Sequence, residues 1–215
     1  MSLSLKGRLW LVIEFALLFF GVPTWIYLDQ DFIHPSIIIL PVLVFIFMLL
    51  RRSSDFKWSE LIRWQVPREV ILGNGVLIAL AALLMLGYVY FFDRESLFNL
   101  PRANIWLYLA LCLFYPVFSA FGQEIIYRTF LSRRYSGILA KKWHFVVASA
   151  LTFSFMHIVY YDPVSMILTF MGGLYFARNY QITRSVLFTS VLHGIFGIMM
   201  FGVGLGQHFW LDMPV

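Results

Sequence analysis

Residues 104–128 read NIWLYLALCLFYPVFSAFGQEIIYR, an apolar run that ends in the ionisable pair Glu124 and Arg128. A helix needs about 20 consecutive apolar residues to cross a bilayer, and this run is long enough. Ionisable side chains within such a segment are costly in lipid, so by default they mark a functional site. The segment therefore predicts a membrane-spanning helix that carries chemistry near its middle.

The composition of the whole chain agrees with a membrane protein. It is 61% hydrophobic and 13% charged, whereas soluble domains contain about 25% charged residues. The formal net charge of +5 does not indicate nucleic-acid binding, because the basic residues lie at the ends of the apolar runs. We therefore predict the lipid bilayer, and no nucleic acid, as the surroundings of this protein.

Seven apolar runs are long enough to span a membrane. They fall at roughly 9–28, 34–50, 70–92, 104–122, 143–160, 163–178 and 185–206. If the N-terminus is cytoplasmic and the sides alternate, every Lys and Arg except Arg94 and Arg102 falls on the inside. Because cytoplasmic loops are enriched in Lys and Arg, we predict an all-α polytopic bundle of about seven helices, N-in and C-out, forming a single domain over residues 1–215.

Two segments predict further detail. The loop from Arg51 to Arg68 places Phe56, Trp58 and other apolar residues among charges, which favours a short helix lying in the membrane interface. The fourth helix continues through Arg128 toward Tyr135, about 32 residues and roughly 50 Å, which is too long for one straight span. We expect a kink near Pro116 or Gly122, or an overhang beyond the membrane, to absorb the excess.

Three polar residues on different helices reach a similar depth in the bilayer. At 1.5 Å per residue, Glu124 and His193 each lie about 14 Å from the cytoplasmic ends of their helices, and His157 roughly 22 Å. Glu124 and Arg128 are one turn apart and can pair directly. Alone, that pair is explained equally well as a structural ion pair. Its conjunction with His157 and His193 indicates a functional site.

Such a set is compatible with several chemistries. A carboxylate and a histidine can deprotonate a water for attack on an amide, and a second histidine can stabilise the resulting oxyanion. Glu124, His157 and His193 would also be a ligand set for a catalytic zinc ion. A proton relay in a transporter is a third possibility, which the lack of an inverted repeat in the sequence weakens.

These residues form motifs that resemble the CPBP family of intramembrane glutamic-type proteases, which comprises CAAX proteases and bacteriocin-processing proteins and is also called Abi. The family pattern is Glu-Glu-x-x-x-Arg, then Phe-x-x-x-His, then His-x-x-x-Asn. The chain shows Gln123-Glu124-x-x-x-Arg128, Phe153-x-x-x-His157 and His193, with a glycine–tyrosine stretch at Gly173–Arg178 before the last motif. The resemblance covers residues 104 to 206, which we expect to be the CPBP-like core.

The resemblance implies an endopeptidase that cleaves a membrane-anchored or lipidated peptide in a cavity facing the cytoplasm, with the bacterial inner membrane as the expected location. It implies that a glutamate and His157 activate water, that His193 steadies the oxyanion and that Arg128 orients the glutamate. No cofactor is required in this scheme. Zinc is an alternative, with Glu124, His157 and His193 as its ligands.

The chain departs from the family pattern at two positions. Gln123 stands where the first glutamate belongs, and Gly197 stands where the asparagine belongs. An amide cannot accept a proton as a carboxylate does, so Gln123 cannot be the general base. Three interpretations remain open: an inactive Glu-to-Gln form of a protease, a protease in which Glu124 is the base, or a non-catalytic pseudoprotease that serves as a membrane scaffold or immunity protein.

Overall fold

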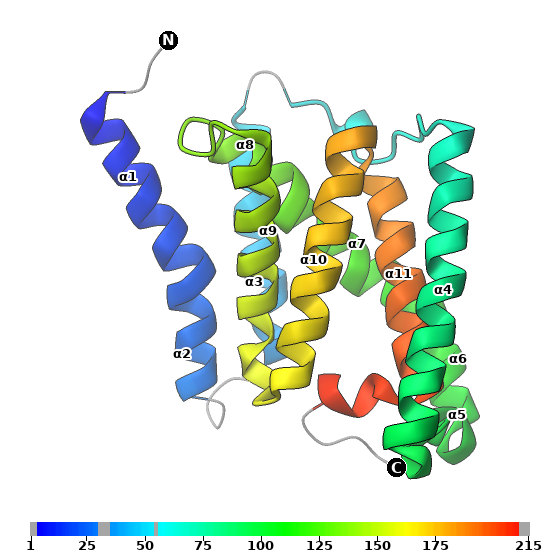
Figure 1. The fold of residues 1–215 in the computed structure, drawn as a ribbon. Coiled ribbons are helices and arrows are strands. Elements are labelled where there is room, and N and C mark those ends of the chain that lie inside the picture. Colours follow the sequence, from blue (N-terminus) through cyan, green and yellow to red (C-terminus); the bar gives the residue numbers. More distant parts are fainter. Residues whose placement is uncertain (1–3, 30–34, 54–55, 211–215) are drawn as a thin grey trace.

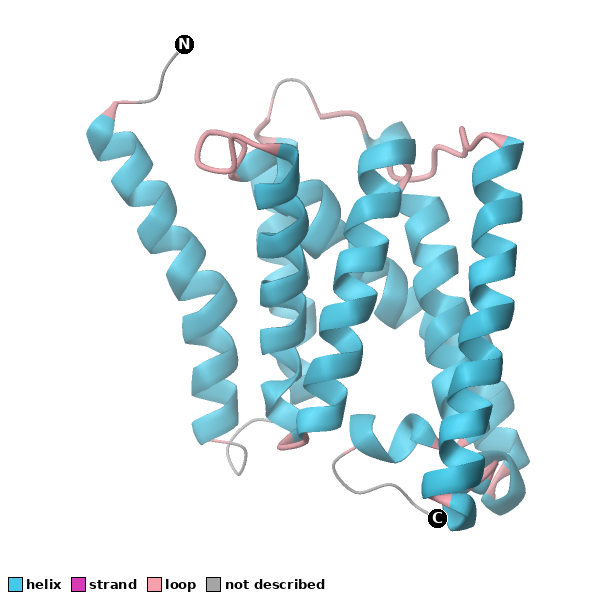
Figure 2. Ribbon diagram, viewed as in Figure 1, coloured by secondary structure: helices cyan, strands magenta, loops and turns pink. Residues whose placement is uncertain are grey.

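The computed structural model describes residues 4–29, 35–53 and 56–210, and this part of the chain is helical without any strand (Figure 2). The helices are α1 (Leu5–Ala16), α2 (Val22–Leu28), α3 (Pro35–Arg51), α4 (Arg68–Phe92), α5 (Asn99–Ala103), α6 (Ile105–Phe114), α7 (Phe121–Glu124), α8 (Leu131–Arg134), α9 (Lys142–Met156), α10 (Pro163–Thr183) and α11 (Val186–Val203). Short 3-10 turns lie at Trp58–Glu60, Arg94–Ser96, His157–Tyr160 and Leu205–Phe209.

Five helical stretches in the described part are long and apolar enough to cross a membrane. They are Leu5–Leu28, Arg68–Phe92, Ile105–Arg134, Lys142–Tyr160 and Val186–Val203. This confirms an all-α polytopic membrane protein. The two other predicted spans are helical as α3 and α10 but fall outside this set. The helix α3 has 17 residues, and α10 carries polar residues in its last turns, so the count of seven stays a prediction.

Consecutive stretches of the bundle run in alternating directions (Figure 1). The helix α1 begins at one end of the bundle and α11 finishes at the other. The end where α1 begins also holds the loop between α3 and α4 and the junctions α8–α9 and α10–α11. In an N-in, C-out chain the first span begins and the last span finishes on opposite sides, as α1 and α11 do here, whereas the side that faces the cytoplasm stays a prediction.

The predicted long fourth helix is continuous from Ile105 to Arg134 but not regular. Two π-helical segments, Tyr115–Ala120 and Ile125–Phe130, separate α6, α7 and α8. The first begins next to Pro116, whose ring and missing N–H disfavour a regular α-helix. π-segments are rare and frequently mark functional sites. The expected kink near Pro116 or Gly122, or overhang, stays a prediction, while α7, which carries Glu124, lies between the two π-helical segments.

The loop before α4 differs from the expected interfacial helix. Apart from the 3-10 turn at Trp58–Glu60, its described residues are irregular, and the predicted cap at residues 54–55 lies outside the described part. The aromatic side chains instead contact separate helices: Trp58 packs against Phe47 of α3 and Trp64 against Phe188 of α11. Because its two tryptophans contact different helices, the segment is extended. It does not form a helix with one continuous apolar face.

The helices α9 and α10 approach each other closely at Gly173. A Cβ atom added at Gly173 would lie 2.8 Å from the Cα of Ala150. Real Cβ atoms do not approach a backbone atom so closely, so only glycine fits there. Small residues at such crossings are typical of membrane helix packing. This contact sets the spacing of the two helices that flank the polar site.

We expect Gly173→Ala to lower the free energy of unfolding by about 1–3 kcal/mol, because α9 and α10 must move apart. The measurement is thermal unfolding of the purified protein in detergent. Gly87→Ala in α4 is the matched control, since nothing lies within 4 Å of its added Cβ. An unchanged melting temperature for Gly173→Ala would contradict the predicted packing.

Candidate active site

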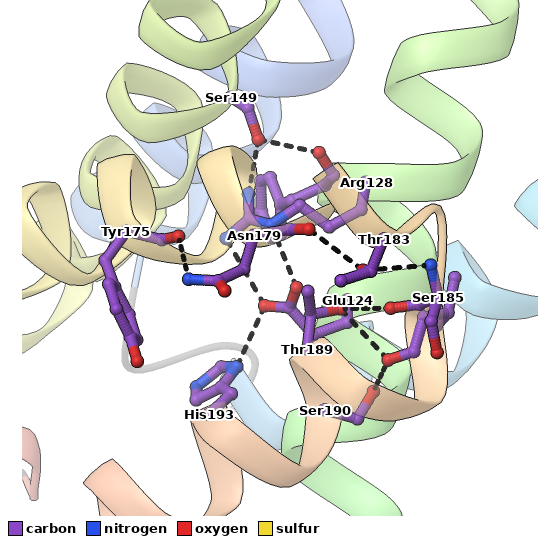
Figure 3. A network of polar contacts seen from close by, with 12 residues as sticks. Glu124, Arg128, Ser149, Tyr175, Asn179, Thr183, Ser185, Thr189, Ser190 and His193 are labelled. Atoms are coloured by element: carbon purple, nitrogen blue, oxygen red, sulfur yellow. Dashed lines mark hydrogen bonds and ion pairs between the residues drawn. The ribbon is translucent and has the colours of Figure 1, made fainter. Parts of the chain in front are cut away.

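The buried ion pair of Glu124 and Arg128 forms the centre of the polar network (Figure 3). Both side chains are completely buried. Arg128 donates from Nε to Oε2 of Glu124 at 2.9 Å and from Nη2 to Oε1 at 3.3 Å. Its Nη1 donates to Ser149 of α9, whose hydroxyl in turn donates to the backbone carbonyl of Tyr127 at 2.7 Å. A charge pair in lipid is tolerated only when its hydrogen-bonding groups are satisfied in this way.

The guanidinium of Arg128 is also enclosed by aromatic rings. It lies 5.5 Å from the ring centroid of Phe153 and 5.9 Å from that of Phe176. Such cation–π contacts strengthen when water is excluded. The phenylalanine of the second motif therefore separates the ion pair from the histidine one turn later.

His193 of α11 joins this network through its Nδ1, which lies 3.1 Å from Oε1 of Glu124. The imidazole stacks on Phe176, with centroids 4.9 Å apart and planes 18° from parallel. Because the carboxylate accepts the Nδ1 proton, the second nitrogen, Nε2, is turned to the other side. There it lies 3.1 Å from the hydroxyl of Tyr115.

The sequence predicts His157 within the helix that begins near Lys142. In the structure it instead begins the 3-10 turn that follows α9. Its Nδ1 lies 2.7 Å from the carbonyl oxygen of Phe153, so Nδ1 carries the proton and the lone pair of the neutral ring lies on Nε2. Among the described residues, this Nε2 has no hydrogen-bond partner. The ring packs edge-on against Phe153, at 4.9 Å between centroids.

Gln123 points to a different side of the helix from Glu124. Its Nε2 donates to the hydroxyl of Ser119 at 2.9 Å. Its Oε1 is buried without a hydrogen-bond partner among the described residues. Leaving a buried polar atom unpaired costs about 1–3 kcal/mol, so this oxygen is a place where a water or a ligand group would be bound.

A cavity of about 510 Å³ brings these groups together. Its polar lining includes Gln123, Ser119, Tyr115, His157 and His193, while α4, α10 and α11 supply mostly apolar walls. Glu124 and Arg128 do not line it. Of the residues singled out from the sequence, three therefore face the cavity, and the ion pair lies behind them.

The cavity extends from the middle of the bundle toward the end where α11 finishes, since Tyr160 and Phe209 also line it. With the N-terminus inside, this is the half nearer the outer face. The side of the membrane toward which the cavity opens stays a prediction.

The residues considered as zinc ligands do not converge. No group of three or more His, Cys, Asp or Glu side chains in the described ranges is placed to hold a metal ion. Both oxygens of Glu124 already accept hydrogen bonds from Arg128 and His193. The arrangement therefore does not fit a shared site for Glu124, His157 and His193, and we derive no step through a metal.

Tyr115 is not among the residues that the sequence motifs single out. The signals for it are its spacing of two helical turns from Gln123 and the glycine at position 197. A Cβ atom at Gly197 would lie 2.2 Å from Cε1 of the Tyr115 ring. The tyrosine thus occupies the space over the position where the family pattern has asparagine. Gly197 lies one helical turn after His193, on the same face of its helix. Tyr115 lies two turns before Gln123, on the same face of that helix.

We expect Arg128→Ala to destabilise the protein by about 3–5 kcal/mol, because it leaves the Glu124 carboxylate buried and unpaired. The matched control is Arg134→Ala, which breaks a more exposed pair with Glu14 (Arg134 Nε to Oε1 of Glu14 2.8 Å) and is expected to cost less than about 1 kcal/mol. Thermal unfolding in detergent compares them. Equal losses in the two variants would contradict a central role for the buried pair.

Comparison with known proteins agrees with the motifs. Residues 104–199 match the family model described as type II CAAX prenyl endopeptidase, Rce1-like. No curated protein and no solved structure matches the chain. The matched residues run from the start of α6 into α11 and contain the whole polar network described above, together with the cavity residues of those helices. Over residues 104–199 the chain is therefore similar to the Rce1-like type II CAAX prenyl endopeptidases, which confirms the resemblance seen in its sequence.

Proposed function

We propose that this protein is an intramembrane endopeptidase that hydrolyses a membrane-anchored or lipidated peptide within the 510 Å³ cavity. The family match supports an endopeptidase in general. The observation that carries the finer proposal is the pair of unpartnered acceptors, Nε2 of His157 and Oε1 of Gln123, in the lining of one cavity. In the proposal a single water molecule, with its two O–H donors, satisfies both.

In the proposed reaction, His157 is the general base. The carbonyl of Phe153 fixes its tautomer, so Nε2 accepts a proton from the water as the oxygen attacks the scissile carbonyl. Gln123 accepts the other O–H and orients the water without taking a proton. The protonated His157 then donates to the leaving amine as the C–N bond breaks. The products are a carboxylic acid and an amine.

Tyr115 and His193 form the proposed oxyanion site. With a proton on each nitrogen, His193 donates Nδ1–H to Glu124 and Nε2–H to the oxygen of Tyr115. The tyrosine hydroxyl is then free to donate to the negative oxygen of the tetrahedral intermediate. The Glu124 carboxylate accepts from Nδ1 of His193 and fixes the orientation of its ring, and Arg128 holds the carboxylate. In this proposal Glu124 and Arg128 are positioning residues, because they do not reach the cavity.

The apolar walls suit a lipidated substrate. Leu77, Leu80 and Leu84 of α4 face Leu168 and Met171 of α10 across the cavity. Toward the end where α1 begins, the two helices are linked by Asn74, which donates to Asn179 at 2.9 Å and accepts from the Tyr175 hydroxyl. The volume is within the range of about 300–1,000 Å³ usual for ligand sites. An acyl or prenyl chain would lie between these walls, with its peptide near His157.

The test is cleavage of a fluorogenic prenylated CAAX-type peptide by the protein in proteoliposomes. We expect His157→Ala to lower kcat at least about 100-fold, since it removes the base. His144→Gln, at the start of α9 and outside the cavity, should keep full activity. Gln123→Glu should raise the rate, because a carboxylate can share the proton. If neither the native chain nor Gln123→Glu cleaves any such peptide, the protein is instead a non-catalytic scaffold or immunity protein.

We expect Tyr115→Phe to lower kcat roughly 100-fold with little change in KM, because it removes one oxyanion donor. The ring remains to fill the space over Gly197, so stability should fall only by the loss of the hydrogen bond to His193, about 1 kcal/mol. Tyr108→Phe is the matched control, since Tyr108 lies on the same helix, contacts Gly202 of α11 and does not line the cavity. Equal activity of Tyr115→Phe and the native chain would exclude the role proposed for Tyr115.

A further inference from the structure

A second cavity lies at the opposite end of the bundle from the 3-10 turn that carries His157. It has a volume of about 920 Å³ and is enclosed by the end of α3, the following loop, α8 and the junction of α10 with α11. None of its lining residues belongs to the catalytic cavity. Its function must therefore be sought in its own side chains.

The lining of this cavity is strongly basic. Five arginines contribute to it, against one carboxylate from Glu60; they are Arg52, Arg63, Arg133, Arg134 and Arg184. Glu60 forms an ion pair with Arg133, and Arg134 pairs with Glu14 of α1. Within the described residues, the other three arginines have no carboxylate partner. The cavity thus keeps an excess of positive charge beside a membrane-embedded bundle.

The base of the cavity is apolar. Leu49 and Leu50 of α3, Phe130 and Tyr180 all line it. Arg184 lies over the ring of Tyr180, 5.6 Å from its centroid. Its backbone has the left-handed conformation, with φ of 52°, which is uncommon for a residue other than glycine. This conformation ends α10 and holds the arginine at the cavity.

We propose that this cavity binds a phosphate-bearing anion, supplied either by the headgroup of an anionic phospholipid or by free phosphate. Arginine forks bind phosphate oxygens in a bidentate manner, and basic pockets between membrane helices are suited to lipid headgroups. The apolar base would take the first part of an acyl chain. If the N-terminus is cytoplasmic, the cavity lies at the leaflet where anionic lipids are concentrated.

Binding at this place would link segments that are far apart in the sequence. A single anion would be shared by Arg52 at the end of α3, Arg63 in the loop and Arg184 after α10. A ligand that binds only the folded state raises its stability in proportion to the logarithm of ligand concentration. The proposal therefore predicts a thermal shift that does not depend on catalysis.

The experiment measures the melting temperature of the full chain in detergent with added phosphatidylglycerol, with phosphatidylcholine of the same acyl chains, or with millimolar inorganic phosphate. Native mass spectrometry records retained lipid. We expect phosphatidylglycerol to raise the melting temperature and phosphatidylcholine not to. A full effect of inorganic phosphate alone would identify free phosphate as the source, and an effect of the lipid alone would identify the headgroup.

Substitutions of single arginines test whether the ligand that shifts the melting temperature binds in this cavity. Arg63→Gln and Arg184→Gln should each weaken the apparent affinity about tenfold or more, because each removes a charged hydrogen-bond donor. Arg63→Lys and Arg184→Lys keep the charge and should retain part of the binding, which guards against a folding defect in the glutamine variants. Arg68→Gln, in the next helix but outside the cavity lining, should bind normally. Equal shifts with both lipids, or an unchanged shift in both glutamine variants, would overturn the proposal.

Discussion

The structure depends on the buried ion pair between Glu124 and Arg128. Two charges at 0% exposure within lipid-embedded helices require partners on every side, and three other helices supply them. Ser149 comes from α9, Phe176 from α10 and His193 from α11. Because an unpaired charge there would be far more costly than any single contact, the pair determines how these helices are rotated around α7. The cavity is a consequence of that rotation.

The same network controls the two histidines. Each has its Nδ1 held by an acceptor: the Glu124 carboxylate for His193 and the Phe153 carbonyl for His157. Each therefore presents Nε2 to the cavity. Their acceptors differ in charge, and this difference separates their proposed roles. The charged acceptor ties His193 to the buried ion pair, whereas His157 stands apart from that pair and takes the proposed role of base.

Much of the architecture could be predicted from local pattern. The length of the apolar runs predicted helices that cross a membrane, whereas the π-helical segments Tyr115–Ala120 and Ile125–Phe130 have no signal in the hydrophobic pattern beyond Pro116. The loop before α4 was less predictable, because Trp58 and Trp64 pack on different helices rather than along one helical face. His157 was placed within α9, although it begins the turn that follows, because residue counting cannot show where a helix tightens.

The sequence by itself determined the membrane class and the family resemblance and singled out the candidate site residues, because hydrophobic length and motif spacing are properties of the chain alone. It could not decide between Gln123 and Glu124. Neighbouring residues on a helix point about 100° apart, so only one of them can face the cavity. The packing of α9 and α11 against Arg128 and Glu124 turned the carboxylate inward and the amide toward the cavity. Only the tertiary structure placed Tyr115 in the space that Gly197 leaves, because that contact joins two helices distant in the sequence.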